Sequence, residues 1–387
     1  MDNLFSAYGV VALTHLGLQM GFAHLDHRKQ KRKEKYPMAG IFPSVGVVIP
    51  VYNEDCDTLK MCIESVLGNG YPGEMYVSVV DDGSTNQCPE LTEIMADPRF
   101  NGIVTSNLGK REAQMIAFKQ LKGKAQIIVT IDSDTIIEAG GIQKLIEPFV
   151  DIQVGAVTGH VQVTNERKNL LTRIISSRYW NAFNQERAAQ SLFGVVFCCS
   201  GPFSAYRSEI IARIAGDYTN QTFLGAPCTF GDDRHLTNLI MREGYKVQFA
   251  QNANAFTHVP ENLNQYRKQQ IRWSKSFARE MFWTFPNLRK HHIYFAYDFL
   301  MQLILPFFLI AALIHAVTQG ISNPVTLAFY AGVIFLLAFI RAIYALLRTR
   351  KLIFLIFGIY GFMYIFFLIP IKIYALATVR NNGWGTR

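Results

Sequence analysis

Acidic residues follow three short apolar runs of the chain. The motifs are Tyr52-Asn53-Glu54, Asp81-Asp82 and Asp132-Ser133-Asp134. Two carboxylates spaced i, i+2, as in Asp132 and Asp134, can hold a hard divalent cation that also bridges phosphates, and such a cation neutralises a leaving diphosphate. A D-x-D triplet alone is at least as often a solvated turn. Its position after a buried strand, with a second acidic motif ending another strand, favours a metal and phosphate site.

A second pair of acids, Asp232 and Asp233, follows Gly231 and precedes an apparent helix. A carboxylate at a helix start can be a simple cap. The alternative is that one of the two acts as a general base for an acceptor hydroxyl. The residues alone do not decide which acid has that role.

Two further motifs combine tryptophan with arginine. Gln269-Gln270-Ile271-Arg272-Trp273 lies in a basic, aromatic segment, where the residue types suit an interfacial anchor as well as a site that stacks on a sugar and contacts a phosphate. The chain ends in Trp384-Gly385-Thr386-Arg387. A terminal segment of this kind is usually frayed.

Strand and helix patterns alternate around the acidic motifs. We expect strands at 45–50, 76–80 and 126–131 and helices at 58–67 and 111–121. This alternation predicts a mainly parallel α/β sheet, in which ligands bind at the carboxyl ends of the strands.

The composition divides the chain into a soluble part and a membrane part. Only 17% of the residues are charged, against about a quarter in ordinary domains, and 295–378 is almost free of acids. The expected organisation is an N-terminal membrane helix (1–26), a cytosolic catalytic domain (37–260), amphipathic interfacial helices (261–290), a transmembrane or re-entrant region (294–379) and a cytosolic tail (380–387). Within the membrane region we expect spans at 295–317 and 325–347 and a broken re-entrant or interfacial segment at 352–378.

The net charge of +9 comes largely from two basic runs beside apolar segments, 27–33 and 348–351. This placement follows the positive-inside rule and argues against nucleic acid as a partner. The six cysteines show no zinc spacing, and we interpret them as reduced thiols of a cytosolic domain.

Five motifs in this order carry a family resemblance. They are Val48-Ile49-Pro50-Val51-Tyr52-Asn53-Glu54, Asp81-Asp82-Gly83-Ser84, Asp132-Ser133-Asp134, Gly231-Asp232-Asp233 and Gln269-x-x-Arg272-Trp273. Together they resemble the processive family-2 glycosyltransferases with a GT-A fold, which include cellulose, chitin and hyaluronan synthases. The segments 158–161, 181–191, 199–202, 220–225 and 384–387 look most like class I hyaluronan synthases. Nodulation chitooligosaccharide synthases share Glu186-Arg187-Ala188-Ala189-Gln190 and, like this chain, leave room for one N-terminal membrane helix.

The resemblance implies a role for each motif. Tyr52, Glu54, Asp81, Lys110 and Asp132 would form the nucleotide pocket, and Asp134 would bind Mg²⁺ or Mn²⁺. Asp233 would be the base beside Asp232, and Cys199, Ser200, Gly201 and Pro202 would lie by the acceptor. Arg272 and Trp273, together with Trp384, Gly385, Thr386 and Arg387, would close over the diphosphate and the acceptor.

The expected function is therefore inverting transfer of GlcNAc and GlcA from UDP-GlcNAc and UDP-GlcA to a growing β-linked polysaccharide. The polymer would leave through the enzyme's own helices in the plasma membrane. A chitin or chitooligosaccharide synthase that uses UDP-GlcNAc only is the alternative. A non-catalytic membrane transporter is a remote third possibility, because the apolar spans contain few polar residues that could line a pore.

Overall fold

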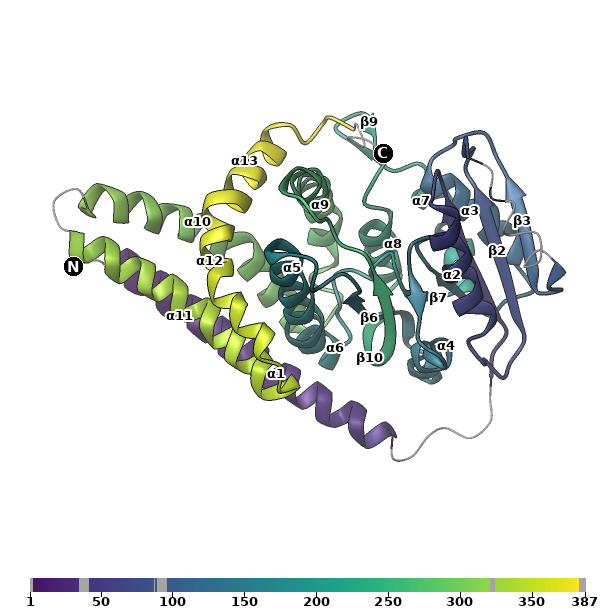
Figure 1. Ribbon diagram of the computed structural model, residues 1–387, viewed down its shortest axis with the longest axis horizontal. Helices are drawn as coiled ribbons and strands as arrows, with labels where there is room; N and C mark the ends of the chain where they lie inside the picture. The colour runs from purple at the N-terminus through teal and green to yellow at the C-terminus, as the bar shows by residue number, and fades with distance from the viewer. Residues whose placement is uncertain (1–2, 35–41, 87, 89–95, 321–323, 383–387) are drawn as a thin grey trace.

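The computed structural model describes residues 3–34, 42–86, 88, 96–320 and 324–382. A domain built on a sheet lies at one end and a group of long helices at the other (Figure 1). The strands are β1 (Val45–Val51), β2 (Met75–Asp81), β3 (Phe100–Val104), β4 (Ile127–Thr130), β5 (Ile136–Ile137), β6 (Val154–Val163), β7 (Ser204–Arg207), β8 (Thr222–Phe223), β9 (Ala226–Pro227) and β10 (Lys246–Thr257). The helices are α1 (Asn3–Glu34), α2 (Cys56–Leu67), α3 (Lys110–Leu121), α4 (Gly141–Ile146), η3 (Glu147–Val150), α5 (Leu170–Asn181), η4 (Ala182–Arg187), α6 (Ala188–Leu192), α7 (Ser208–Thr219), α8 (Asp232–Arg242), α9 (Leu263–Thr284), η5 (Phe285–Asn287), α10 (Ile293–Gly320), α11 (Pro324–Thr349), η6 (Leu352–Ile359), α12 (Tyr360–Met363), η7 (Tyr364–Leu368) and α13 (Ile369–Ala377).

The main sheet has eight strands in the order β3-β2-β1-β4-β7-β6-β10-β5. Neighbours from β3 to β4 are parallel, as are β6 and β10, whereas β7 runs antiparallel to both β4 and β6. All seven residues of β1 are buried, as expected for a central strand covered on both faces. The predicted α/β class with a mainly parallel sheet is confirmed.

Helices cover both faces of the sheet. On one face, α2 and α4 pack on β1, β2 and β4. On the other, α3, α6, α7 and α8 form a larger core that also includes Ala23 of α1 and Phe295 and Phe299 of α10. The long helices are therefore attached to the sheet domain through a shared apolar core.

Two of the predicted helices begin at residues whose side chains cap them. Asp55 accepts a hydrogen bond from the backbone N–H of Thr58 at 3.0 Å, so α2 begins at Cys56, two residues before the predicted start. Asn262 accepts one from the N–H of Gln265 at 2.9 Å and starts the amphipathic helix α9. Both caps satisfy an N–H group that the helix leaves unpaired.

Among the described residues, three segments are long and apolar enough to cross a membrane: Ile293–Thr318, Ala328–Thr349 and Leu352–Ala377. The first two lie in α10 and α11 and match the predicted spans 295–317 and 325–347. The third is broken into 3-10, α and π turns. The interruption is the one expected for 352–378, while its path relative to a bilayer stays a prediction.

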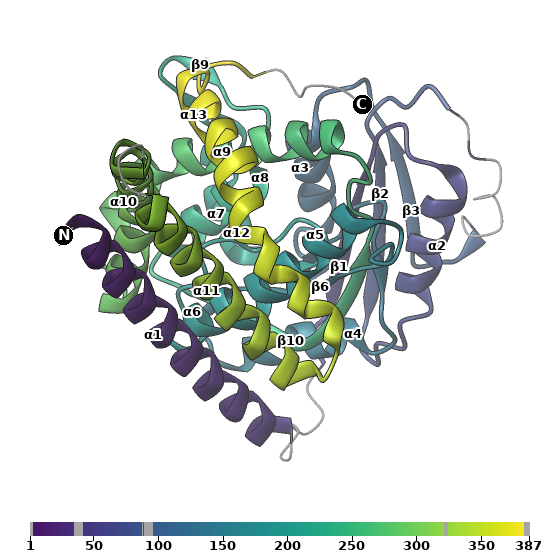
Figure 2. The same ribbon diagram turned by 60° about the vertical axis from the view of Figure 1, so that its left-hand side comes forward.

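Helix α1 extends beyond the predicted span 1–26 and contains the whole basic run 27–33, ending at Glu34. Its second half docks on the sheet domain: Gln30 Nε2 donates to the carbonyl of Phe249 at 2.9 Å, and His27 bonds to the carbonyl of Asn184 at 3.0 Å. Figure 2 shows α1, α11 and α12 lying side by side along one side of the sheet domain. The run 27–33 is therefore part of a docked helix.

Candidate active site

The carboxyl ends of three parallel strands place the first acidic motifs together. Val51 pairs with Asp81 between β1 and β2, and Val48 pairs with Thr130 between β1 and β4. The residues that follow these strands leave the sheet at one edge, which is where ligands bind in such sheets.

Two side-chain contacts then join motifs that are distant in sequence. Ser133 Oγ donates to Glu54 Oε2 at 2.6 Å, and Lys110 Nζ donates to Asp132 Oδ1 at 2.6 Å. The same Lys110 nitrogen lies 3.5 Å from Asp232 Oδ2. Lys110 therefore connects the D-x-D motif after β4 to the acidic pair at the start of α8.

Burial acts to lower the pKa of Lys110, but the carboxylates of Asp132 and Asp232 outweigh it and hold that pKa well above its usual value. The ammonium group is therefore charged at neutral pH. Its position is fixed by Asp82, which accepts hydrogen bonds from the backbone N–H groups of Leu108 (2.6 Å) and Gly109 (2.8 Å). The sequence gives no sign of a separate role for Asp82. In the structure it shapes the turn that delivers Lys110.

The loops after β1 and β2 are bound to each other beside the predicted nucleotide residues Tyr52 and Asp81. Asp81 Oδ1 accepts from the N–H of Ser84 at 2.8 Å, and Ser84 Oγ accepts from the N–H of Asn53 at 2.8 Å. Gly83 has a φ of 79°, and a Cβ there would lie 2.6 Å from a backbone nitrogen. Only glycine fits this turn without displacing the neighbouring loop.

A disulfide between Cys56 and Cys88 contradicts the interpretation of all six cysteines as reduced thiols. The two cysteines are 32 residues apart, in the segments after β1 and β2, and the parallel pairing of those strands brings them together. The spacing in the sequence carries no sign of this pairing. The cysteines that do remain free are Cys62, Cys198, Cys199 and Cys228.

The two acids at the start of α8 have different surroundings. Asp232 is buried and faces Lys110, whereas Asp233 accepts from the N–H of Arg234 at 2.7 Å and from the Cys198 thiol at 3.5 Å. Burial, followed by the negative charge of Asp232, raises the pKa of Asp233. A carboxylate with a raised pKa is a better proton acceptor, so Asp233 is the better candidate for a base.

The predicted acceptor segment 199–202 lies against the helix α8 that carries the acidic pair and against the D-x-D motif. The N–H of Cys199 donates to Thr237 Oγ1 on α8 at 2.9 Å, and Ser200 Oγ accepts from Arg187 Nη2 at 2.9 Å. A Cβ on Gly201 would meet Asp132 Oδ2 at 3.2 Å. A side chain at Gly201 would thus enter the space beside the D-x-D motif, and Pro202 follows directly.

The residues present fit a divalent cation held together with phosphates. Lys110 pairs with Asp132 Oδ1, and Oδ2 of Asp132 and the half-buried carboxylate of Asp134 are oxygen atoms of the kind that could coordinate such a cation. The described residues contain no group of three or more His, Cys, Asp or Glu side chains that could hold a metal alone. A site with one or two carboxylates suits Mg²⁺, which typically takes its remaining ligands from water and substrate phosphates.

Trp273 and Arg272 lie on α9. Trp273 is 47% exposed, and its ring centroid is 6.4 Å from that of Tyr179. Burial, followed by the charge of Asp134, raises the pKa of Tyr179, so the tyrosine that contacts Trp273 is also near the D-x-D motif. Arg272 is half-buried on the same helix.

Two buried cations of α9 that the sequence analysis missed hold the chain that leads to the tail. Arg279 is 1% exposed and donates to the carbonyls of Val379 (2.7 Å) and Asn381 (3.3 Å), while Lys275 Nζ donates to Asn381 at 3.2 Å. Thr229, two residues before Gly231, donates to the carbonyl of Asn382 at 2.8 Å. The predicted tail residues Trp384, Gly385, Thr386 and Arg387 lie outside the described residues. The sequence signal that could have pointed to this anchor is the spacing of Lys275 and Arg279, which are four positions apart and therefore lie on one side of the helix.

Replacing Arg279 by methionine is expected to lower the rate of sugar transfer by about 10- to 100-fold, because loss of an anchor that positions reacting groups has effects of this size. The donor KM should rise together with the fall in kcat. Steady-state UDP release measures both. Arg289→Met, which removes an exposed arginine beyond the end of α9, is the matched control. Normal kinetics in a folded Arg279→Met protein would show that this anchor has no role in transfer.

Comparison with known proteins shows which family has this arrangement. The family model described as "Glycosyl transferase family 2" matches residues 46–215, from β1 to α7. An N-acetylglucosaminyltransferase of Neorhizobium galegae is 34% identical over 100% of this chain and 91% of its own length. A hyaluronan synthase of Streptococcus pyogenes is 37% identical over 98% of this chain and 90% of its own length.

The fold has a solved counterpart. A mannosyltransferase from Pyrobaculum calidifontis, determined in complex with GDP-Man and Mn²⁺, superposes with a TM-score of 0.56 at 18% identity and covers 98% of this chain and 100% of its own. At this identity the likeness shows the GT-A fold. With two relatives above 30% identity that are matched over about nine tenths of their own length, the chain belongs to glycosyltransferase family 2, and its described residues combine a GT-A domain with three apolar segments long enough to cross a membrane.

Proposed function

We propose that this glycosyltransferase builds hyaluronan by alternating transfer of GlcNAc and GlcA from their UDP-sugars to the end of a growing chain. The observation that carries the proposal is the position of Lys110, which joins Asp132 of the donor motif to Asp232 beside Asp233. A site for the nucleotide and a candidate base thus lie within one ion-paired cluster, next to the 199–202 segment.

In the proposed reaction Asp233 takes the proton of the acceptor hydroxyl. The hydroxyl oxygen forms a bond to the anomeric carbon of the donor while the bond from that carbon to the diphosphate breaks. The electron pair leaves with UDP, and the proton later passes from Asp233 to solvent. Attack on the face opposite the leaving group inverts the anomeric configuration and gives a β-linkage. Lys110 stays charged beside the departing diphosphate.

Mg²⁺ or Mn²⁺, when bound by Asp134 and the second oxygen of Asp132, would supply positive charge to the leaving diphosphate. Tyr52, Glu54 and Asp81 would hold the nucleotide. Arg272, Trp273 and the tail 384–387 would cover the diphosphate and the acceptor.

We further propose that the enzyme lies in the plasma membrane with its catalytic domain in the cytosol, and that the product leaves between its helices. The segment after α11 supports a cytosolic C-terminus because both of its ends contact the catalytic domain. Phe354 lies 5.4 Å from Trp180 between ring centroids, and the carbonyl of Asn382 accepts a hydrogen bond from Thr229 at 2.8 Å.

The second candidate is synthesis of a chitooligosaccharide from UDP-GlcNAc alone. It is favoured by the match to N-acetylglucosaminyltransferases, one of which is 34% identical over 100% of this chain and 91% of its own length.

Radiolabelled donors separate the two candidates. With the full-length protein in lipid nanodiscs, we expect sustained UDP release and polymer only when both UDP-GlcNAc and UDP-GlcA are present, and a product degraded by hyaluronidase. A product that forms from UDP-GlcNAc alone and is degraded by chitinase would contradict hyaluronan synthesis and support the second candidate. Absence of UDP release with either donor would overturn both.

A further inference from the structure

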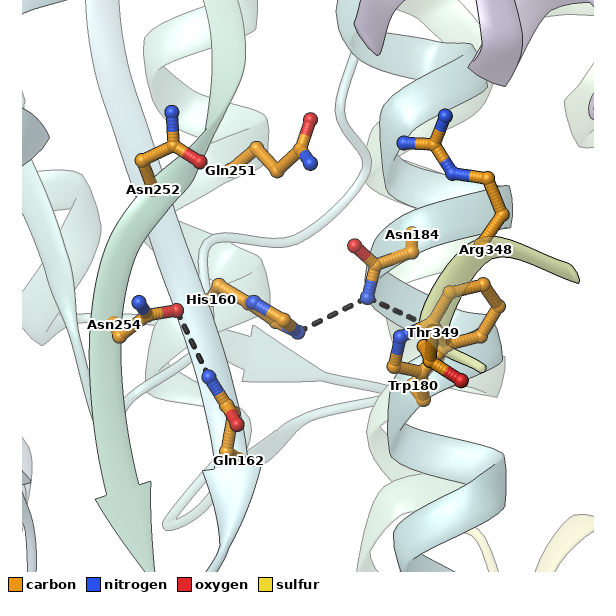
Figure 3. Close-up of a pocket in the computed structure, with 9 residues that line it drawn as sticks. All are labelled: His160, Gln162, Trp180, Asn184, Gln251, Asn252, Asn254, Arg348 and Thr349. Atoms are coloured by element: carbon orange, nitrogen blue, oxygen red, sulfur yellow. Dashed lines mark hydrogen bonds between the residues drawn. The ribbon is translucent and has the colours of Figure 1, made fainter. Parts of the chain in front are cut away.

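A pocket of about 260 Å³ lies between the sheet and the end of α11 (Figure 3). Strands β6 and β10 form one wall, through Gln162, Asn252 and Asn254. Trp180 of α5, Asn184 of η4 and Arg348 of α11 form the other. None of these residues belongs to the proposed donor, base or acceptor groups. The volume is close to the lower end of the roughly 300–1,000 Å³ typical of small-molecule sites.

The lining is almost entirely uncharged but polar. Five of its nine residues are asparagine or glutamine, none is acidic, and Arg348 is its one cationic residue. An amide both donates and accepts hydrogen bonds, as hydroxyl groups do. Burial lowers the pKa of His160, a further lining residue, to about 4, so this side chain is neutral at pH 7. The ligand class that matches such a lining has many hydroxyl groups and little charge.

Three of the five amides are held by hydrogen bonds before any ligand arrives. Asn184 Nδ2 bonds to His160 Nε2 at 3.0 Å and donates to the carbonyl of Trp180 at 3.1 Å, while Gln162 Nε2 donates to Asn254 Oδ1 at 2.9 Å (Figure 3). Groups held in place lose less side-chain entropy on binding. The pocket is therefore organised as a binding site.

An indole completes the wall opposite the strands. Trp180 is half-buried, and its ring centroid lies 6.0 Å from that of Tyr344 and 5.4 Å from that of Phe354. These contacts keep the indole beside the amides, where its apolar surface can cover the C–H face of a sugar ring. Arg348 is exposed at the end of α11 and can pair with a carboxylate on that ring.

We propose that this pocket is a second saccharide-binding site, separate from the active site, that takes one pyranose ring of an oligosaccharide. It binds neutral rings through the amides and Trp180, and it binds uronate rings more tightly through Arg348. The proposal holds for either candidate polymer. An anionic lipid headgroup fits less well, because headgroup sites typically gather several basic side chains and this pocket has one.

The test uses the full-length protein in phosphatidylcholine nanodiscs, saturated with UDP, and photoreactive tetrasaccharides of chitin and of hyaluronan. After irradiation, peptide mapping locates the label. We expect label on 246–257 or 180–184 in addition to any label at the active site, and displacement by unlabelled tetrasaccharide. Asn252→Leu should reduce the pocket label at least tenfold while UDP release is retained. Asn101→Leu, on the exposed edge strand β3, is the matched control.

Two further variants complete the design. Gln162→Leu, on β6, should also reduce the pocket label at least tenfold. It tests the same site if Asn252→Leu does not fold. Arg348→Gln should weaken labelling by the hyaluronan tetrasaccharide about tenfold and leave labelling by the chitin one unchanged. Label confined to 198–202 and 272–273, or pocket label that phosphatidylglycerol displaces and tetrasaccharides do not, would overturn the proposal.

Discussion

Asp233→Asn is expected to lower the rate of sugar transfer by about 10²- to 10⁴-fold, the usual contribution of a general base, while binding of UDP is retained. The amide keeps the size of the carboxylate and can still accept from the N–H of Arg234. It cannot take a proton from an acceptor hydroxyl. Lys110 pairs with Asp132 and Asp232, so the nucleotide side of the site is unchanged.

The neighbouring acid Asp232 provides a variant to compare with Asp233→Asn. Asp232→Asn removes a partner of Lys110 and should raise the donor KM, whereas Asp233→Asn should act on kcat. UDP release measured over a range of donor concentrations separates the two effects. Asp217→Asn, at an exposed acid near the end of α7 that pairs with Arg242 away from the site, is the control for loss of an ion-paired carboxylate. Turnover close to normal in Asp233→Asn would rule out Asp233 as the base.

The pH dependence has a definite sign. Because burial and the charge of Asp232 raise the pKa of Asp233, this base becomes protonated at a higher pH than an ordinary carboxyl. Transfer should therefore fall as the pH is lowered, and the fall should begin above the usual range for aspartate. Asp232→Asn removes the neighbouring charge and should move this fall to lower pH. A profile of kcat against pH for the two proteins tests the assignment.

The central strands and the acidic motifs could be predicted because their signals are local. An uninterrupted apolar run such as Val45–Val51 reads as a buried strand, and the residue that follows it must lie at the sheet edge. Strand β3 (Phe100–Val104) gave no such signal, because its residues are half-buried or exposed. Strand β7, with four residues, reverses the sheet direction between β4 and β6 and could not be placed without its partners.

Contacts between distant segments could not be predicted from residue patterns. The ion pair of Lys110 with Asp232 joins residues 122 positions apart, and the Cys56–Cys88 disulfide depends on the register of two strands. Arg279 lies on an amphipathic helix whose basic residues suit a membrane surface. In the structure it is buried and donates to the backbone carbonyl of Val379. In each case the partner is set by the tertiary fold.

Removal of divalent cations is expected to reduce transfer by at least about 10³-fold, because charge stabilisation by a bound cation is worth several kcal/mol in the transition state. The full-length protein is treated with EDTA and freed of the chelator, and UDP release is measured as Mg²⁺ or Mn²⁺ is added back. Recovery with either ion is the expected result. Full activity after chelation would contradict a metal-dependent reaction.

The D-x-D variants distinguish a metal ligand from a nucleotide contact. Asp134→Asn should raise the Mn²⁺ concentration needed for half-maximal activity, because an amide oxygen carries no charge. Asp132 already pairs with Lys110 through Oδ1, so Asp132→Asn should weaken donor binding as well as the response to metal. Asp217→Asn again serves as the control. If Asp134→Asn leaves the Mn²⁺ requirement unchanged while Asp132→Asn raises it, the two aspartates have the opposite roles.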